Sequence, residues 1–251
     1  MSLAIVMPAY NEADCIEEVV RAWLKVLQRL PGFLLVVNDG SKDRTAEILN
    51  RIAASEPCLK VVHQTNAGHG AAVLRAYREA LMPGVTHVFQ TDSDDQFKPE
   101  DFWQLWERRE KSPFITGFRK ARSDAFHRLV ITRVVIALNL LFFGVKLKDS
   151  NIPFRLIRAD FLKALLQMLP DEVFAPNIFL TVLAAKAGST LFELPIIHEE
   201  RKTGQVSIIR WKLVKICFRC AGELLRFRQS LHAQRPQLES LKSRYVTSSH
   251  R

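Results

Sequence analysis

The chain has 251 residues, of which 48% are hydrophobic and 25% charged, and its formal net charge is +10 at pH 7. This composition excludes a disordered or fibrous chain and is ample for the core of one large α/β domain or two small ones. The charge excess lies at the end of the chain, because residues 201–251 hold twelve Lys or Arg and two Glu while the first 200 residues are balanced. Such a basic end suits nucleic acid, an anionic membrane surface, or solvent alone.

The cysteines and the beginning of the chain predict a reducing compartment. Met1 is followed at once by an apolar strand, with no basic leader segment, and four cysteines are present. This combination predicts a cytoplasmic protein. Cys217 and Cys220 have C-x-x-C spacing, but no second Cys or His pair lies nearby to complete a zinc site, so two cysteines on one helix face are expected.

Strand-like and helix-like segments alternate along the first ninety residues. In chain order they are strand 3–7, helix 16–30, strand 33–37, helix 45–54, strand 59–63, helix 71–81 and strand 85–91. This alternation predicts an open, mostly parallel central sheet flanked by helices. Ligands of such sheets bind beyond the carboxyl ends of the strands. Four polar loops fall at that edge, namely 8–12, 38–43, 66–70 and 92–94.

The acidic loop after the fourth predicted strand is the most informative. Asp92 and Asp94 stand one residue apart there. Two carboxylates at a strand end suit Mg²⁺ or Mn²⁺, with substrate phosphates completing the coordination shell. The alternative is a solvated turn that caps a helix beginning at Pro99. A dinucleotide fingerprint fails because Val73 occupies its third glycine position, and no P-loop motif is present.

Four motifs occur in order along these loops: Pro8-Ala9-Tyr10-Asn11-Glu12, Asn38-Asp39-Gly40-Ser41, Asn66-x-Gly68-x-Gly70 and Asp92-Ser93-Asp94-Asp95-Gln96. Together they resemble the family 2 glycosyltransferases of the GT-A fold, and within them the dolichol-phosphate mannosyltransferase-like, polyprenyl-phosphate sugar transferases. Further matches are Gly117-Phe118-Arg119, residues 149–158 and residues 193–197. The resemblance implies a GT-A domain over residues 1–205. A basic amphipathic helical extension follows over 206–251, and its polar segment after Ser230 is expected to fray.

The resemblance implies a donor site with a metal. The residues expected to bind the nucleotide are Pro8, Tyr10, Glu12, Asp39, Gly68 and Asp92. Asp92, Asp94 and Gln96 match the positions that hold a metal on the donor diphosphate, where the cation neutralises charge on the departing nucleoside diphosphate. The family usually has Asp where this chain has Asn38, which leaves the base open. The loops at Asp39 and Gly68 are equally consistent with ordinary strand-to-helix turns, and no catalytic role is expected for His69.

The acceptor side of the expected site combines one carboxylate with several arginines. Asp149 stands where the family carries its candidate catalytic carboxylate. It could act as a general base, orient an acceptor phosphate that is already largely a dianion because its second pKa is about 6, or merely cap a loop. Guanidinium groups suit phosphate oxygens. The candidate acceptor-phosphate ligands are Arg119, Arg128, Arg133, Arg155 and Arg201, of which the first and last match family arginines most clearly.

Two segments bear on contact with lipid. Residues 134–145 are uncharged but too few for the ~20 that cross a bilayer, so they form either a core helix or an interfacial amphipathic helix. From Ile209 onward, Lys212, Lys215, Arg219 and Arg226 form a basic stripe beside apolar residues. This pattern fits an interfacial helix or a solvated face over a domain core.

The sequence therefore predicts an inverting glycosyltransferase. It would move a sugar from a UDP- or GDP-linked donor to a polyprenyl phosphate, bound peripherally to the anionic inner face of the cytoplasmic membrane. One alternative is a GT-A transferase acting on a soluble saccharide or protein hydroxyl, with Asp149 as base. The other is a nonenzymatic nucleic-acid-binding protein. The intact metal motif and the lack of interleaved aromatic residues in the tail disfavour it, so no nucleic-acid partner is expected.

Overall fold

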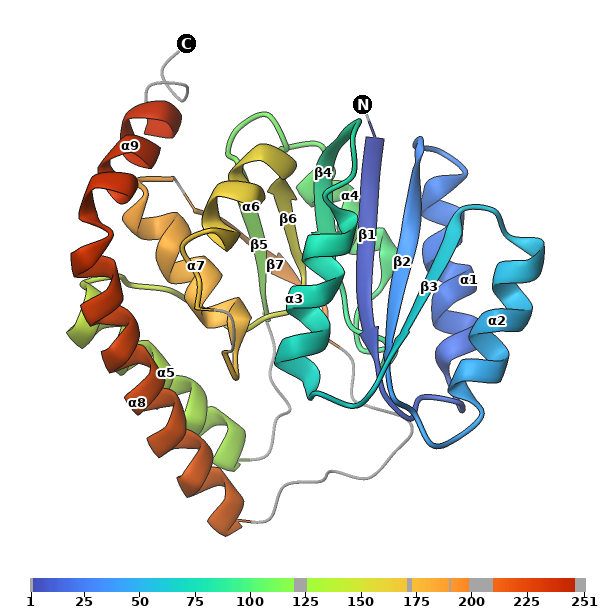
Figure 1. Cartoon of the computed structure of the whole chain (residues 1–251), viewed down its shortest axis with the longest axis horizontal. Helices are drawn as coiled ribbons and strands as arrows, with labels where there is room; N and C mark the ends of the chain where they lie inside the picture. The colour runs from blue at the N-terminus through green and yellow to red at the C-terminus, as the bar shows by residue number, and fades with distance from the viewer. Residues whose placement is uncertain (1, 120–125, 171–172, 190, 199–209, 247–251) are drawn as a thin grey trace.

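The computed structural model describes the chain except residues 1, 120–125, 171–172, 190, 199–209 and 247–251, and it describes no side chains for residues 126–132, 210–220 and 246. Within the described part, seven strands form one sheet in the order β3-β2-β1-β4-β6-β5-β7 (Figure 1). β6 runs antiparallel to β4 and β5, whereas the other neighbouring strands are parallel, which confirms the predicted mostly parallel sheet. The strand bounds are Ser2–Ala9 (β1), Gly32–Asp39 (β2), Leu59–Gln64 (β3), Val85–Gln90 (β4), Phe114–Arg119 (β5), Arg155–Arg158 (β6) and Phe192–Ile196 (β7).

Helices cover both faces of the sheet. Adjacent residues of β1 illustrate this, because Ile5 and Val6 belong to two different buried clusters on opposite faces. On one face lie α1 (Ile16–Leu27), α2 (Thr45–Ser55) and α4 (Phe102–Trp106), the last preceded by the 3₁₀ turn Pro99–Asp101. The other face is covered by α3 (His69–Ala80), α5 (Phe126–Phe143), α6 (Ala159–Leu166), α7 (Pro176–Lys186), α8 (Arg210–Ala233) and α9 (Arg235–Val246).

The strand order creates a crevice at the edge where the motif loops lie. The chain runs from β1 outward to β2 and β3 and then returns to β4 on the other side of β1. At such a reversal the connections after neighbouring strands diverge and leave room for a ligand. The motif loops that follow β1 and β4 flank this point (Figure 1).

Several element boundaries differ from the predicted ones. β1 continues to Ala9 and β2 to Asp39, so Pro8 and Asp39 lie on strand ends, because the parallel pairing of β1 with β2 extends to the Ala9–Asn38 pair. α3 begins at His69, two residues earlier than predicted, and α1 ends at Leu27, three residues earlier.

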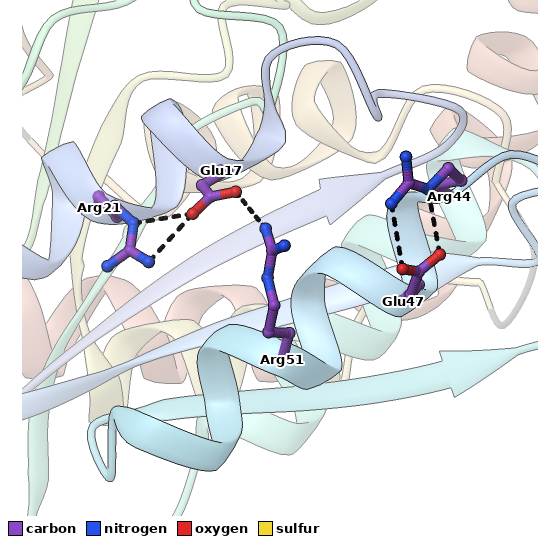
Figure 2. Close-up of polar contacts among 5 residues, drawn as sticks. All are labelled: Glu17, Arg21, Arg44, Glu47 and Arg51. Atoms are coloured by element: carbon purple, nitrogen blue, oxygen red, sulfur yellow. Dashed lines mark hydrogen bonds and ion pairs between the residues drawn. The ribbon is translucent and has the colours of Figure 1, made fainter.

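A surface ion-pair cluster joins two helices away from this edge. Glu17 of α1 pairs with Arg21 one turn later and with Arg51 of α2, and Arg44 pairs with Glu47 at the start of α2 (Figure 2). These side chains are largely exposed, so each pair contributes at most about 1 kcal/mol. The buried clusters therefore carry the packing of α1 and α2 on the sheet.

The described part of the basic tail belongs to the domain core. Leu224, Phe227 and Leu231 of α8 are buried in the cluster that also holds Phe179 of α7, and the Phe227 and Phe179 rings lie 4.8 Å apart. The polar segment after Ser230 was expected to fray, but its described residues include α9, a helix whose Tyr245 packs against Phe161 and donates a hydrogen bond to Asp160. That expectation was wrong because apolar residues recur on one face of α9. The domain boundary predicted at 205 falls within residues 199–209, outside the described part.

α5 and α8 lie side by side at one end of the molecule (Figure 1). Phe143 is buried, and its ring lies 6.0 Å from that of Phe227. On the same helix Leu140 and Leu141 are 53% and 73% exposed. α5 therefore has both a core-facing side and an exposed apolar side. No helix in the described residues is long and apolar enough to cross a membrane.

Candidate active site

A first cavity of about 390 Å³ lies at the crevice beside β1 and β4. All six residues expected to bind the nucleotide line it, and so does Asp94. The full lining is Pro8, Ala9, Tyr10, Glu12, Asp39, Asn66, Gly68, His69, Ala72, Asp92, Ser93 and Asp94. Four loops distant in sequence thus meet around one space, as the parallel sheet predicted.

The Asp39 carboxylate connects two of the segments that surround this cavity. Its Oδ1 accepts hydrogen bonds from the Gln64 side chain (2.7 Å) and the Ala67 amide (2.8 Å), and its Oδ2 accepts one from the Gly68 amide (2.9 Å). A carboxylate has about four acceptor sites, so three are used inside the protein. Gly40 completes this packing, because it has a φ of +66° and a Cβ there would lie 2.6 Å from the Asn66 nitrogen.

The loop after β1 is tied to the loop after β2. The Asn11 amide donates to Ser41 Oγ (3.0 Å), and the Glu12 amide donates to Thr45 Oγ1 (2.9 Å). Asn38, which replaces the usual family Asp, is buried, its Nδ2 lies 3.0 Å from His63 Nδ1, and it does not line the cavity. The neutral residue at position 38 therefore serves the loop structure, and Asp39 is the carboxylate at the cavity.

The acidic pair Asp92 and Asp94 is electrostatically strained without a cation. Burial raises the pKa of Asp92 well above its ordinary value, and the neighbouring Asp94 carboxylate raises it further, while Arg119 acts in the opposite direction. Asp92 Oδ1 is buried and has no hydrogen-bond partner among the described residues. With Glu12 and Asp39, four carboxylates surround one cavity. A diphosphate would be repelled from this cavity unless a cation accompanied it.

These residues fit a divalent cation in part. Carboxylate oxygens are the ligands that Mg²⁺ and Mn²⁺ prefer, and the unpartnered Asp92 Oδ1 is a suitable donor. No group of three or more His, Cys, Asp or Glu in the described part of the chain is placed to hold a metal by itself. Asp92 and Asp94 would therefore share the ion with oxygens from a bound phosphate. Gln96 lines neither cavity, and its backbone N–H donates to Asp94 Oδ1 at 3.4 Å.

A second cavity of about 580 Å³ adjoins the first, because Gly68, His69 and Asp92 line both. Its other walls come from three places. They are the start of α3, the end of β5 together with Asn151 and Pro153, and the segment 173–177. The start of α3 packs directly on that segment, since a Cβ at Gly70 would lie 2.6 Å from the carbonyl oxygens of Val173 and Phe174. Gly70 thus fixes the distance between the two walls.

Arg119 and Asp149 form a buried ion pair beside the second cavity. Arg119 Nη1 lies 3.0 Å from Asp149 Oδ2, and their side chains are 15% and 6% exposed. Arg119 lines the cavity, and its Nε is buried without a partner among the described residues. The structure therefore brings together the expected carboxylate and one expected acceptor arginine.

Arg155 occupies a different place from the one expected. It is fully buried, and its guanidinium donates to the carbonyl oxygens of Ile152 and Ser150, to that of Asn177 at 2.9 Å, and to Thr181 Oγ1 at 3.2 Å. Its expected role as an acceptor-phosphate ligand is corrected, because the protein itself occupies its donors. Arg155 instead clamps the loop that follows Asp149 onto the start of α7.

The other expected arginines add nothing to the described site. Arg133 is exposed on α5 and lines neither cavity. Arg201 lies outside the described residues, and so does the side chain of Arg128. Arg119 is thus the one candidate acceptor arginine that lines a cavity in the described part of the chain.

Several residues without an expected role also line these cavities, and two of them bear on the site. His69 borders both, and Asn177, on α7, borders the second. The position of His69 between Gly68 and Gly70 of a motif could have predicted that it lines the site. Asn177 had no such signal, because it reaches the site only through the packing of α7 against α3 and β6.

The fold and the acidic crevice define the class of protein. A crystal structure of glucosyl-3-phosphoglycerate synthase from Mycobacterium tuberculosis, in complex with Mn²⁺, UDP and phosphoglyceric acid, superposes with a TM-score of 0.66. The superposition covers 90% of this chain and 78% of the synthase chain, at 17% sequence identity. The chain accordingly has the GT-A-like fold that the motifs predicted.

The family follows from the sequence match. Residues 4–166 match the family described as Glycosyl transferase family 2, and the chain belongs to this family. It is 28% identical over 225 residues to an undecaprenyl-phosphate 4-deoxy-4-formamido-L-arabinose transferase of Edwardsiella ictaluri, covering 86% of this chain and 66% of the relative. It is 26% identical over 233 residues to an undecaprenyl-phosphate mannosyltransferase of Micrococcus luteus, covering 85% and 95%. The chain thus spans about two thirds of the first relative's length and nearly all of the second.

Proposed function

We propose that this protein transfers a sugar from a nucleoside-diphosphate sugar to a polyprenyl phosphate, with inversion at the sugar carbon. The observation that carries the proposal is the pair of adjoining cavities that meet at Asp92. One is lined by the acidic motif residues and the other by Arg119. The names of the relatives, which are undecaprenyl-phosphate sugar transferases, support the acceptor.

The first cavity would hold the UDP or GDP part of the donor. Tyr10 is 42% exposed at this cavity and offers a ring face for a base, while Glu12 and the remaining acceptor site of Asp39 suit base N–H and ribose hydroxyl groups. Asp92 and Asp94 would hold Mg²⁺ or Mn²⁺ on the diphosphate, with Gln96 as a further candidate ligand. When bound, the cation supplies charge neutralisation for the departing nucleoside diphosphate.

The second cavity would receive the acceptor phosphate near Arg119. A phosphate monoester has a second pKa of about 6, so at pH 7 its oxygen is already a nucleophile and needs no strong base. The 3.0 Å contact with Asp149 fixes the Arg119 guanidinium, which supports a positioning role for Asp149. The phosphate oxygen would attack the sugar carbon from the side opposite the diphosphate. Arg201 and Arg128 are further candidates for this phosphate.

The membrane side of the proposal rests on α5 and the basic tail. Leu140 and Leu141 expose an apolar surface on α5, and Arg226 is exposed on the neighbouring α8. Exposed apolar and basic residues on two neighbouring helices suit the interface of an anionic membrane, here the inner face of the cytoplasmic membrane. Flotation with vesicles of phosphatidylglycerol, but not of phosphatidylcholine alone, is the expected result, and equal absence from both would refute this part.

The transfer itself is tested by incubation with radiolabelled UDP- and GDP-sugars, Mn²⁺ or Mg²⁺ and undecaprenyl phosphate, followed by organic extraction. We expect label in the organic phase with one donor, and none when EDTA is added or when undecaprenol replaces its phosphate. Label found only on soluble saccharides would favour the alternative acceptor. No product with any donor would refute the proposal.

A further inference from the structure

Three buried polar atoms around the second cavity have no hydrogen-bond partner among the described residues. They are Asp92 Oδ1, Arg119 Nε and Asn177 Oδ1. Buried polar groups are nearly always paired in folded proteins, because an unpaired group loses its bonds to water without replacement. Several such groups on the walls of one cavity therefore indicate a polar ligand. The roles of Asp92 and Arg119 are already accounted for, whereas that of Asn177 is not.

The Asn177 side-chain oxygen makes no hydrogen bond within the described part of the protein. Its backbone carbonyl accepts from Arg155 and from the Thr181 hydroxyl (2.7 Å), which anchors the first turn of α7. The residue is only 3% exposed, yet its carboxamide oxygen Oδ1 has no hydrogen-bond partner among the described residues. Asn139 offers a partial contrast, because its Oδ1 is also unpartnered but its Nδ2 donates to Ser150 Oγ at 3.1 Å and the residue lines neither cavity. The backbone of Asn177 thus belongs to the fold, and its side chain is available to a ligand.

The position of Asn177 selects the part of the substrate that it would meet. The second cavity joins the nucleotide cavity at Asp92, so the group that follows the diphosphate of a bound donor enters there. That group is the sugar. A carboxamide is neutral and both donates and accepts, which matches a sugar hydroxyl better than it matches a phosphate. The phosphate is better served by Arg119.

We propose that Asn177 determines which sugar is transferred, by hydrogen-bonding a hydroxyl of the donor sugar through its carboxamide. This inference rests on the proposed function, since it assumes a nucleotide-sugar donor in the first cavity. A site built to pair with a hydroxyl discriminates against sugars that lack it or present it elsewhere, because the buried amide is then left unpaired. Asn177 is therefore a specificity residue, separate from the acidic pair that holds the diphosphate.

The test measures binding of a panel of UDP- and GDP-sugars by displacement of a fluorescent nucleotide in the presence of Mn²⁺, so it needs no acceptor. We expect the protein to prefer one sugar among those on the same nucleotide. Asn177→Ala should reduce that preference by about tenfold or more, as loss of one hydrogen bond to a buried group implies, and leave the affinity for UDP or GDP within twofold.

Thermal unfolding separates this role from a structural one. Asn177→Ala removes an unpaired buried carboxamide oxygen, so its melting temperature should equal or exceed that of the unaltered protein. Asn139→Ala also removes such an oxygen but loses the hydrogen bond to Ser150 Oγ, so it should melt lower than Asn177→Ala. An unchanged sugar preference in Asn177→Ala would overturn the inference, and so would a loss of UDP affinity together with a lowered melting temperature. Absence of any sugar preference in the unaltered protein would also overturn it. Failure to glycosylate undecaprenyl phosphate would count against the proposed function alone.

Discussion

Replacement of Arg155 by Met is expected to destabilise the protein strongly. The guanidinium is completely buried in β6 and donates to three backbone carbonyls and to one hydroxyl. Met is similar in length but has no donor, so these acceptors lose a charge-assisted partner. Each buried acceptor left without a donor costs about 1–3 kcal/mol, so the loss of several such bonds costs about 3–5 kcal/mol or more. For a chain of this size that corresponds to a melting temperature lower by about 6–20 °C.

Arg158→Met is the matched control. Arg158 lies on the same strand three residues later, and its ion pair with Asp160 is 38% and 46% exposed. Such a surface pair is worth about 0–1 kcal/mol, so this variant should melt close to the unaltered protein. The comparison keeps the substitution and the strand constant, and it contrasts a fully buried guanidinium with a partly exposed one that pairs with Asp160 and lies over the Tyr245 ring.

Thermal and urea unfolding followed by circular dichroism measure both variants. A free energy of unfolding for Arg155→Met within about 1 kcal/mol of that of the unaltered protein would refute the reasoning, because surface substitutions have effects of that size. If that stable variant also lost affinity for undecaprenyl phosphate, the original expectation of Arg155 as an acceptor ligand would be restored.

Three further predictions concern the cavities. Asp94→Ala should abolish the metal-dependent rise in melting temperature that UDP or GDP produces. Asp95→Ala, which removes the ion pair of Asp95 with Lys98, should retain it, and equal responses of the two variants would contradict the metal assignment. Because the pKa of Asp92 is raised in the folded state, its ionisation opposes folding, and this cost appears as pH rises from the ordinary value through the raised one. Without metal, Asp92→Asn should therefore melt higher at pH 8, and Mn²⁺ affinity of the unaltered protein should rise with pH in titration calorimetry. Gly70→Ala should destabilise by about 1–3 kcal/mol, since its Cβ would meet the Phe174 carbonyl, and an unchanged midpoint in urea would contradict this.

Much of the fold could be predicted because its signals are local. Buried parallel strands read as continuous apolar runs, and their carboxyl ends must meet at one edge of the sheet. That rule placed Pro8, Asp39 and Asp92 around one space before any contact was known, and the structure has them there. The ends of the strands were less predictable, because the pairing of β1 with β2 continues past the apolar runs.

The tail shows where local pattern is ambiguous. A helix with one apolar and one basic face can lie on a membrane or on its own domain, since both offer an apolar surface. The burial of Leu224 and Phe227 against α7 assigns this part of α8 to the domain core. α5 combines a side packed on the domain core with an exposed apolar side, because Phe143 is buried and Leu141 is exposed.

The sequence by itself determined the class of sheet, the edge at which the motif loops meet and the acidic residues that line the first cavity, because strand periodicity and motif spacing are properties of neighbouring residues. Only the tertiary structure decided that Arg155 is a clamp and that Asn177 borders the second cavity. An arginine reads the same in sequence whether its donors meet phosphate or the carbonyl of a residue 22 positions away. What separates these roles is burial and the identity of its partners, and both arise from long-range packing that no local pattern specifies.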